Sequence, residues 1–207
     1  PVGPKGRVLP ALHRDVGIKL IWKGEVNMNV THLSLPEVLL ITPEIHPDHR
    51  GHLAVPFSVS AYEQAGISFS LRQMNQGYSK KAFTIRGLHY QQPPYHQAKL
   101  VSANHGSFFS VAVDIRKDSP TFGQWCGAVL SFENQRLMYV PRGFAHGYLT
   151  LEPDTVLQYC VDNDFCGPAA KALRFDDPDI GIAWPEKPDE TTLTEKDRNA
   201  TLLQDLS

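Results

Sequence analysis

Long apolar runs and an excess of positive charge are both missing from this sequence of 207 residues. No stretch approaches the roughly 20 consecutive apolar residues of a membrane-spanning helix, so no membrane anchor is expected. Lys and Arg number 20 against 22 Asp and Glu, which gives a formal net charge of −2. This balance argues against a general nucleic-acid or membrane surface, and any anionic ligand must be held by a local group of cations.

Cysteine is also scarce. The three cysteines, Cys126, Cys160 and Cys166, are odd in number and have no Cys-x-x-Cys spacing. Disulfide frameworks and zinc ribbons usually show paired or closely spaced cysteines. We therefore predict reduced thiols in a cytoplasmic protein.

Helical periodicity is rare as well, whereas short β-prone runs recur from Val38 onward. A parallel α/β fold would place helical stretches of about ten to fifteen residues between its strands. Their absence predicts an all-β sandwich or barrel, in a single domain at residues 28–207. Strands are expected at residues 38–42, 53–58, 67–75, 84–91, 99–103, 107–115, 125–131, 135–140, 145–151 and 155–161. Two short peripheral helices are expected at residues 60–66 and 194–203, the second with Thr194 as its N-cap.

Residues 1–27 precede Met28 and do not begin with methionine. They contain no convincing apolar segment followed by a small-residue cleavage site, which a secretory signal would need. We interpret them as a tag-like or upstream-translated extension. The alternative is a genuine N-terminal arm.

The segment Arg86-Gly87-Leu88-His89-Tyr90-Gln91 places a guanidinium and an imidazole in an otherwise β-prone run. In a regular strand two residues that are three apart point to opposite faces. A glycine inside a strand often marks a bulge, and one extra residue at Gly87 would turn both side chains toward a common cavity. The alternative is a solvated arginine beside a buried structural histidine.

The run at residues 107–115 is almost continuously apolar, which predicts a strand covered on both faces. Asp114 is the exception, and a buried carboxylate needs a partner. We expect it to cap a turn or to pair with Arg116.

Eight segments, taken together in their order and spacing, resemble the dTDP-4-dehydrorhamnose 3,5-epimerase family from about Val38 to Leu203. The segments are His49-Arg50-Gly51, Gln73-Met74-Asn75, Arg86-Gly87-Leu88-His89-Tyr90-Gln91, Lys99-Leu100-Val101, Val113-Asp114-Ile115-Arg116, Pro141-Arg142-Gly143-Phe144-Ala145-His146-Gly147, Asp177-Pro178-Asp179-Ile180-Gly181-Ile182-Ala183-Trp184-Pro185 and Leu193-Thr194-Glu195-Lys196-Asp197. The resemblance implies a cupin-type β-barrel, or jelly roll. It also implies an enzyme of deoxysugar biosynthesis that inverts carbons beside the ketone of a dTDP-linked 4-keto-6-deoxy sugar.

The resemblance further implies a role for each matching residue. His89 would be the base that removes the proton, with Asp197 as its partner carboxylate. Tyr159 falls at the position of the family's proton-donating tyrosine, and Lys99 would face the enolate oxygen. The residues expected to hold the nucleotide diphosphate and the sugar are Arg50, Gln73, Asn75, Arg86, His146 and Lys196, with Phe165 where the family usually has a tyrosine that stacks on the thymine ring.

These residue types suit the chemistry. A proton on carbon beside a ketone is weakly acidic, so the enzyme must supply a base with a near-neutral pKa and must stabilise the enolate. Histidine with an aspartate partner meets the first need, and a lysine ammonium meets the second. Without the resemblance, Lys99 would be interpreted as a solvated strand charge, Tyr159 as barrel packing and Asp197 as a helix residue near Arg198.

Several positions depart from the family pattern. An acidic residue is replaced around Val55 and another is missing near residues 169–171, Phe165 lacks the tyrosine hydroxyl, and one extra residue separates Asn75 from Arg86. The sequence therefore leaves open whether the enzyme inverts both C3 and C5 or is a mono-epimerase that inverts only one of them.

A metal-dependent cupin such as a dioxygenase, and a non-catalytic sugar-binding cupin, are the alternatives from other classes. Metal-binding cupins commonly gather several histidines and a carboxylate, whereas here His89 stands without a His-x-His pair. A binding-only protein is expected to lose the base or the acid, and His89, Tyr159 and Asp197 are all present. We therefore expect no metal and no cofactor. We also expect a homodimer, in which the β-rich segment at residues 38–58 adds strands to a partner's sheet.

Overall fold

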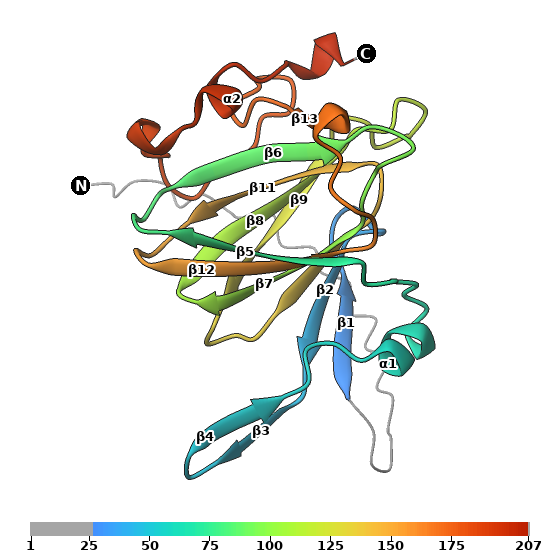
Figure 1. Cartoon of the computed structure of the whole chain (residues 1–207), viewed down its shortest axis with the longest axis vertical. Helices are drawn as coiled ribbons and strands as arrows, with labels where there is room; N and C mark the ends of the chain where they lie inside the picture. The colour runs from blue at the N-terminus through green and yellow to red at the C-terminus, as the bar shows by residue number, and fades with distance from the viewer. Residues whose placement is uncertain (1–26, 207) are drawn as a thin grey trace, which may run out of the picture.

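Two antiparallel sheets packed face to face form the body of the molecule in the computed structural model, which describes residues 27–206 (Figure 1). The six-stranded sheet has the order β1 (Met28–His32), β2 (Leu39–Pro43), β10 (Leu137–Val140), β7 (Lys99–His105), β12 (Thr155–Val161) and β5 (Gln73–Ser79). The five-stranded sheet has the order β13 (Ala170–Ala172), β6 (Ile85–Gln91), β11 (Phe144–Thr150), β8 (Ser107–Asp114) and β9 (Trp125–Ser131). The predicted all-β sandwich or barrel is confirmed.

The remaining elements are short and lie around the two sheets (Figure 1). Strands β3 (Ile45–Asp48) and β4 (Gly51–Ala54) form a separate hairpin. The α-helices are α1 (Val59–Gln64) and α2 (Glu195–Arg198), and single 3₁₀ turns occur at Gly167–Ala169, Glu190–Thr192 and Leu203–Asp205. None of the described helices has the length and apolar character needed to cross a membrane. Helices α1 and α2 are the two short peripheral helices that the sequence predicts.

Apolar side chains fill the space between the sheets, with Phe108 from one sheet and Val101 and Leu157 from the other in the same buried cluster. The outer face of the five-stranded sheet is covered too, because Leu173 and Leu203 of the C-terminal segment pack against β8 and β11. This explains why β8 is buried along nearly its whole length, as its continuous apolar run predicts.

Two predicted strands differ from the observed strands by more than two residues at an end, whereas the others agree to within two residues. In the segment 53–58 the strand ends at Ala54, before Pro56, which has no backbone N–H for a sheet ladder. In the segment 67–75, Ile67 and Phe69 are buried against α1 and the outer face of the six-stranded sheet, and regular pairing with β12 begins only at Gln73. Strands β1, β3 and β13 were not among those expected. Burial of apolar side chains by a helix produces the same sequence pattern as burial by a sheet.

The C-terminal helix is shorter than the expected 194–203. Thr194 caps it as predicted, since its hydroxyl accepts a hydrogen bond from the backbone N–H of Asp197. The helix ends after Arg198, and Thr201 then forms an isolated bridge with Leu173 beside β13. After the helix, the chain therefore runs along the edge of the barrel.

The bulge expected at Gly87 is present. His146 of β11 is opposite His89 of β6, whereas Tyr148 is opposite Arg86, so β6 has one more residue than β11 between these pairs. Gly87 has a φ of +115°, and a Cβ atom there would lie 2.7 Å from the Cα of Gly147. Only glycine allows the two strands to approach this closely, and the bulge brings Arg86 and His89 to one cavity.

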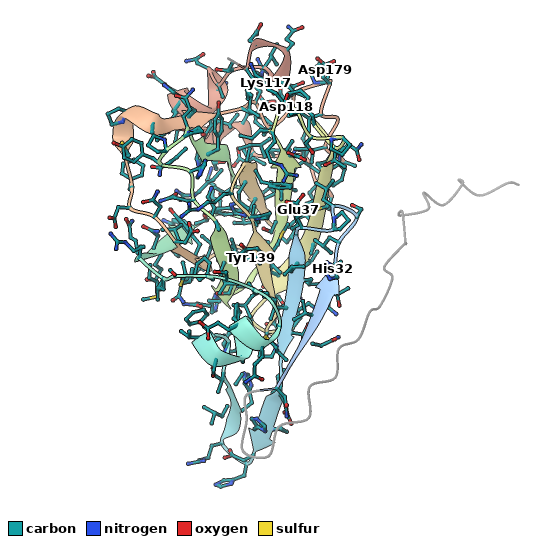
Figure 2. The ribbon with its side chains drawn as sticks, turned by 90° about the vertical axis from the view of Figure 1, so that its right-hand side faces the viewer. His32, Glu37, Lys117, Asp118, Tyr139 and Asp179 are labelled. Atoms are coloured by element: carbon teal, nitrogen blue, oxygen red, sulfur yellow. The ribbon has the colours of Figure 1, made fainter. Side chains whose placement is uncertain are left out.

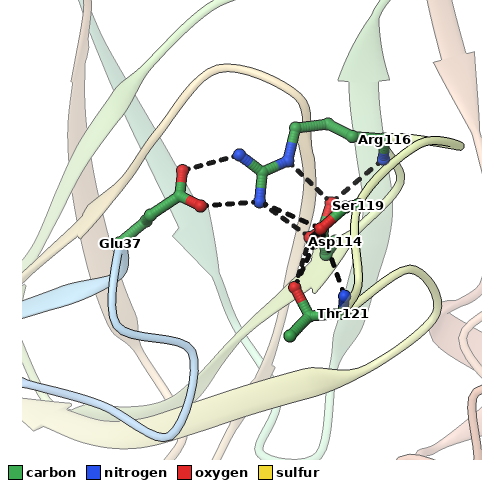
Figure 3. A network of polar contacts seen from close by, with 5 residues as sticks. All are labelled: Glu37, Asp114, Arg116, Ser119 and Thr121. Carbon is green, nitrogen blue, oxygen red and sulfur yellow. Dashed lines mark hydrogen bonds and ion pairs between the residues drawn. The ribbon is translucent and has the colours of Figure 1, made fainter.

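Asp114 lies at the end of β8 and is fully buried within a polar network (Figure 3). It accepts hydrogen bonds from the guanidinium of Arg116 at 2.8 and 2.9 Å, from Ser119 at 2.5 Å and from Thr121 at 2.6 Å. Burial raises the pKa of this carboxyl, but these donors outweigh burial and hold it well below its ordinary value. Arg116 also binds Glu37 with both terminal nitrogens, at 2.6 and 2.8 Å. The predicted structural role of Asp114 is confirmed, and the network joins the end of β8 to the loop between β1 and β2.

The β3–β4 hairpin extends away from the sandwich. Figure 2, turned by 90° from Figure 1, shows it at one end of the molecule, with Lys117, Asp118 and Asp179 labelled at the other end. All four residues of β3 are exposed. A lone two-stranded hairpin is marginally stable in water, and this one makes few contacts with its own barrel.

Candidate active site

A cavity of about 320 Å³ lies between the two sheets. Strands β5, β7 and β12 of the six-stranded sheet form one wall, and β6 and β11 of the five-stranded sheet form the other. The lining residues are Gln76, Gly77, Arg86, His89, Tyr90, Gln91, Gln97, Lys99, His146, Tyr148, Leu157, Tyr159, Phe165, Ala170, Lys171 and Lys196. Seven of the eleven predicted site residues are among them, so the structure brings these seven together at one cavity.

His89 and Asp197 form the first functional pair of the site. Nε2 of His89 lies 2.6 Å from Oδ1 of Asp197, whose side chain is only 4% exposed. Burial raises the pKa of Asp197, but the hydrogen bond and charge of His89, with smaller effects of Thr194 and Lys196, lower it overall. Asp197 is therefore ionised and accepts the Nε2–H of His89, which leaves Nδ1 as the nitrogen able to take a proton.

Lys99 is a buried cation on the opposite wall, and its Nζ donates a hydrogen bond to the backbone oxygen of His89 at 2.8 Å. Burial lowers its pKa from 10.5 to about 8, because a charged ammonium is costly away from water. At neutral pH the group remains charged. It can thus stabilise negative charge that develops near His89.

Tyr159 lies on β12, in the sheet opposite His89, and lines the same cavity. Burial raises the pKa of its hydroxyl, an effect that the charge of Arg86 partly opposes. The phenol is therefore protonated at neutral pH and able to donate. Tyr159 is also paired with Asn75 of β5 across the ladder, so their side chains project from the same face.

His146 is buried on β11, directly opposite His89 in the ladder. Its Nε2 lies 2.9 Å from the hydroxyl of Ser110 on β8. Burial lowers the pKa of His146 well below its ordinary value, and the charges of Lys99 and His89 lower it further. His146 is therefore neutral in the folded protein.

Four cations line the cavity, namely Arg86, Lys99, Lys171 and Lys196. The Arg86 guanidinium donates to the backbone oxygen of Tyr78 at 2.9 Å, which fixes one side of it. Asp197, next to Lys196 in the chain, is hydrogen-bonded to His89. This group of cations attracts anions. The net charge of the whole chain is −2, so the attraction is local to the cavity, as the sequence predicts.

Phe165 is an exposed aromatic ring at the cavity, 65% accessible. Its loop is held by two glutamines. Gln73 accepts from the backbone N–H of Phe165 at 3.2 Å, and Gln91 accepts from the backbone N–H of Cys166 at 2.7 Å. Gln73 also donates to Asn75 at 2.5 Å. Gln73 and Asn75, which were expected to bind substrate, lie beside the cavity and do not line it.

Arg50 does not lie in the cavity of its own chain, contrary to the simplest form of the prediction. It lies in the turn of the β3–β4 hairpin, where its side chain is 78% exposed and pairs with Asp48 at 2.6 Å. The hairpin extends away from the sandwich, so Arg50 cannot reach this chain's cavity.

Several residues at the site were not predicted. A sequence pattern could have indicated some of them but not others. Tyr148 is two residues after His146 on one strand, so strand alternation alone places both on one face. Ser110 does not line the cavity but contacts His146. It is a polar residue in the apolar run of β8, the same signal that singled out Asp114. Lys171 comes from the edge strand β13, and no local pattern indicates that this short strand reaches the cavity.

Within residues 27–206 no group of three or more His, Cys, Asp or Glu side chains is arranged to hold a metal ion. The cavity instead presents the imidazole of His89, the ammonium of Lys99 and the phenol of Tyr159. This set can remove a proton, stabilise an oxyanion and return a proton.

The model of the family described as dTDP-4-dehydrorhamnose 3,5-epimerase matches residues 32–205. A dTDP-4-dehydrorhamnose 3,5-epimerase of Sinorhizobium fredii is 42% identical over 174 residues, which are 84% of this chain and 89% of that one. The Legionella pneumophila dTDP-6-deoxy-D-glucose-3,5-epimerase, solved in complex with dTDP-4-keto-L-rhamnose, has a TM-score of 0.82 and 38% identity, covering 87% of this chain and 95% of that one. A 3′-monoepimerase of Streptomyces bikiniensis, solved in complex with dTDP-quinovose, has a TM-score of 0.78 and 33% identity, covering 84% and 87%.

Proposed function

The chain belongs to the dTDP-4-dehydrorhamnose 3,5-epimerase family, and we propose that its epimerisation is carried out by His89, Lys99 and Tyr159. The protein has the cupin-type fold of the family and is an isomerase of dTDP-linked sugars in deoxysugar biosynthesis. The assignment of individual roles to its residues, the carbons that it inverts and its assembly are our proposals.

One observation carries the assignment of roles. His89 and Tyr159 line the same cavity from opposite sheets. A sugar ring lying between the sheets presents one face to each of them. Inversion of a carbon requires that a proton leave from one face and return to the other, so a base and an acid are needed on opposite walls.

The reaction follows from these positions. Nδ1 of His89 takes the proton from the carbon beside the ketone, and the electron pair of the C–H bond moves into the enolate. Lys99, on the wall opposite His89, stabilises the enolate oxygen. Tyr159 then donates its phenolic proton to the other face of the same carbon, and the enolate returns to the ketone. Tyr159 regains a proton from water, and His89 releases one.

The substrate is a dTDP-linked 4-keto-6-deoxyhexose, and no cofactor takes part in our scheme. Arg86 and Lys196 hold the diphosphate, and the exposed ring of Phe165 stacks on the base. His146 contacts the sugar. Gln73 and Asn75 support the wall that carries Tyr159 and the Phe165 loop, which is a more indirect role than the sequence suggests.

We further propose a homodimer whose partner completes the site. The hairpin that carries Arg50 projects from the barrel, and Leu53 on it is 68% exposed. Arg50 of the partner subunit would supply the guanidinium for the diphosphate that the chain's own hairpin cannot supply. Residues 28–207 form the single domain of each subunit, whereas residues 1–26 of the predicted extension lie outside the described residues. The cytoplasmic location stays a prediction, consistent with three free cysteines.

Light scattering at micromolar concentration should show twice the mass of the chain, and Arg50→Ala should weaken dTDP binding without changing that mass. Glu63→Ala on α1, also exposed, is the matched control. A monomer, or an Arg50→Ala variant with unchanged dTDP binding, contradicts the shared site.

For regiochemistry, we propose inversion at both C3 and C5. NMR of the product formed in deuterated water tests this directly, because each inverted carbon carries deuterium in the new configuration. Deuterium with inversion at only one carbon would instead identify a mono-epimerase, the activity named for the Streptomyces bikiniensis relative. Exchange at neither carbon would contradict the roles proposed for His89 and Tyr159.

A further inference from the structure

The two histidines of the cavity face each other across one ladder but have chemically different partners. His89 contacts the carboxylate of Asp197, and His146 contacts the hydroxyl of Ser110. The distances, 2.6 and 2.9 Å, make both contacts hydrogen bonds. Two like groups in one site with different partners are expected to take different protonation states.

The direction of the Ser110–His146 hydrogen bond can be worked out from the partners available. Ser110 is 0% exposed, and the nitrogen of His146 is its hydroxyl's hydrogen-bond partner among the described residues. If Nε2 of His146 carried a proton, it would donate to Ser110, and the buried hydroxyl proton of Ser110 would have no acceptor. A buried donor without an acceptor is costly. Ser110 therefore donates to Nε2, and the proton of the neutral imidazole is on Nδ1.

The groups that face His146 also keep it neutral. Lys99 from β7 and His89 from β6 act on it electrostatically, and Tyr148 on its own strand has its ring centroid 6.5 Å away. Ser110 from β8 contributes an uncharged hydroxyl. Among the described residues no carboxylate is within hydrogen-bond distance of the imidazole. Burial and the nearby charges therefore act together to lower the pKa of His146.

We infer that Ser110 is a positioning residue, which holds His146 neutral with its proton on Nδ1, so that His146 donates a hydrogen bond to a substrate oxygen. The inference rests on the proposed function for the identity of that substrate. His89 and His146 then carry opposite tautomers. His89 offers an unprotonated Nδ1 and acts as the base, whereas His146 offers an Nδ1–H and cannot take the sugar's proton.

The test uses the substrate-free protein labelled with ¹⁵N in histidine. Long-range ¹H–¹⁵N spectra distinguish protonated from unprotonated ring nitrogens, and His146→Asn identifies the His146 signals by their loss. We expect a neutral His146 with Nδ1 protonated from about pH 5.5 to about pH 8, the interval in which an ordinary histidine titrates. A proton on Nε2, or titration of His146 in this interval, overturns the inference.

Two variants give the same test a second arm. Ser110→Thr keeps the hydroxyl and should keep the wild-type tautomer, whereas Ser110→Asp supplies an acceptor and should move the proton to Nε2. The aspartate should also bring titration of His146 into the interval above, and the pH profile of kcat/KM should gain an additional ionisation. If Ser110→Asp leaves the tautomer and the pH profile unchanged, Ser110 is merely structural. If a variant does not fold, the wild-type spectrum still decides.

This experiment separates the two proposals. The spectra require no turnover, so a failure of the protein to epimerise a dTDP-linked keto sugar leaves their result standing. Conversely, a fully active enzyme with an Nε2-protonated His146 would refute the role of Ser110 alone.

Discussion

Asp197 on the C-terminal helix lies 2.6 Å from His89 on β6, although 108 residues separate the two in the chain. The aspartate is buried and the histidine is 41% exposed. The pair therefore has a protected end, where the tautomer is fixed, and an open end toward the cavity.

Replacing Asp197 with asparagine should slow deuterium uptake into the substrate by about a hundredfold or more, since an amide fails to hold the histidine in its basic tautomer. His89→Asn should remove uptake entirely. Both variants should bind dTDP within about twofold of wild type, since neither removes a cation. NMR in deuterated water and calorimetry with dTDP make the measurements. Wild-type uptake in either variant would exclude His89 as the base.

Replacing Tyr159 with phenylalanine should separate exchange from inversion. The enolate still forms, and the imidazolium of His89 returns a solvent-derived deuteron to the face from which the proton came. NMR should therefore show deuterium at a carbon whose configuration is retained. Tyr139→Phe is a suitable control, because Tyr139 lies on β10 and does not line the cavity. Inversion by Tyr159→Phe at the wild-type rate would assign the acid to another group.

Lys99 should impose an alkaline limit on activity. Its ammonium loses charge as the pH rises through about 8, so kcat/KM should fall above that pH. Tyr159 does not explain such a limit, since burial raises the pKa of its hydroxyl. A profile that stays level well above pH 8 would remove Lys99 from oxyanion stabilisation.

Whereas kcat/KM should fall above about pH 8, the contribution of Lys99 to the free energy of unfolding should rise between about pH 8 and pH 10.5. The unfolded chain holds the proton of Lys99 up to its ordinary pKa of 10.5, whereas the folded protein releases it at about 8. The unfolded state therefore binds more protons between these values, and the contribution of Lys99 to the free energy of unfolding rises with pH. Urea unfolding at the two ends of this interval measures the difference. In Lys99→Met this contribution should be absent.

Substituting alanine for Gly87 should cost more stability than the same change at another glycine with positive φ. A Cβ at Gly87 would lie 2.7 Å from the Cα of Gly147 and 2.8 Å from the oxygen of His146, both backbone atoms. At Gly66, with φ +76°, no atom lies within 4 Å of the added carbon. We expect Gly66→Ala to cost about 1 kcal/mol from the backbone conformation alone, and Gly87→Ala to cost at least about 2 kcal/mol more. Equal losses in urea unfolding would show that the close approach of β6 and β11 carries no energetic weight.

The fold was largely predictable because its strands have local signatures. Turn residues separate short β-prone runs, and the bulge at Gly87 followed from one glycine between two functional side chains. The errors occurred where apolar residues are buried by something other than a ladder, as at Ile67 and Phe69. The sequence of such a segment records its burial but not what covers it.

The site divides in the same way. The bulge expected at Gly87 can place Arg86 and His89 on one cavity wall, and strand alternation can place Tyr159 on the other. Nothing local indicates that Asp197 returns to His89, and only the family resemblance predicted it. The actual position of Arg50 was also beyond local reasoning, because the direction of a hairpin depends on what its exposed residues meet. The role of Ser110 depends on the nitrogen that it contacts, which only the three-dimensional structure supplies.

The late position of Asp197 in the chain has a consequence for how the enzyme is made. All eleven strands of the two sheets precede it in the order of synthesis. The barrel is therefore synthesised before the carboxylate that orients His89. A polypeptide that a protease trims back beyond α2 is expected to lose its activity, because it lacks both Asp197 and Lys196. It also lacks Leu203, which helps to cover the outer face of the five-stranded sheet. Possession of all eleven strands therefore does not by itself make the chain an active enzyme.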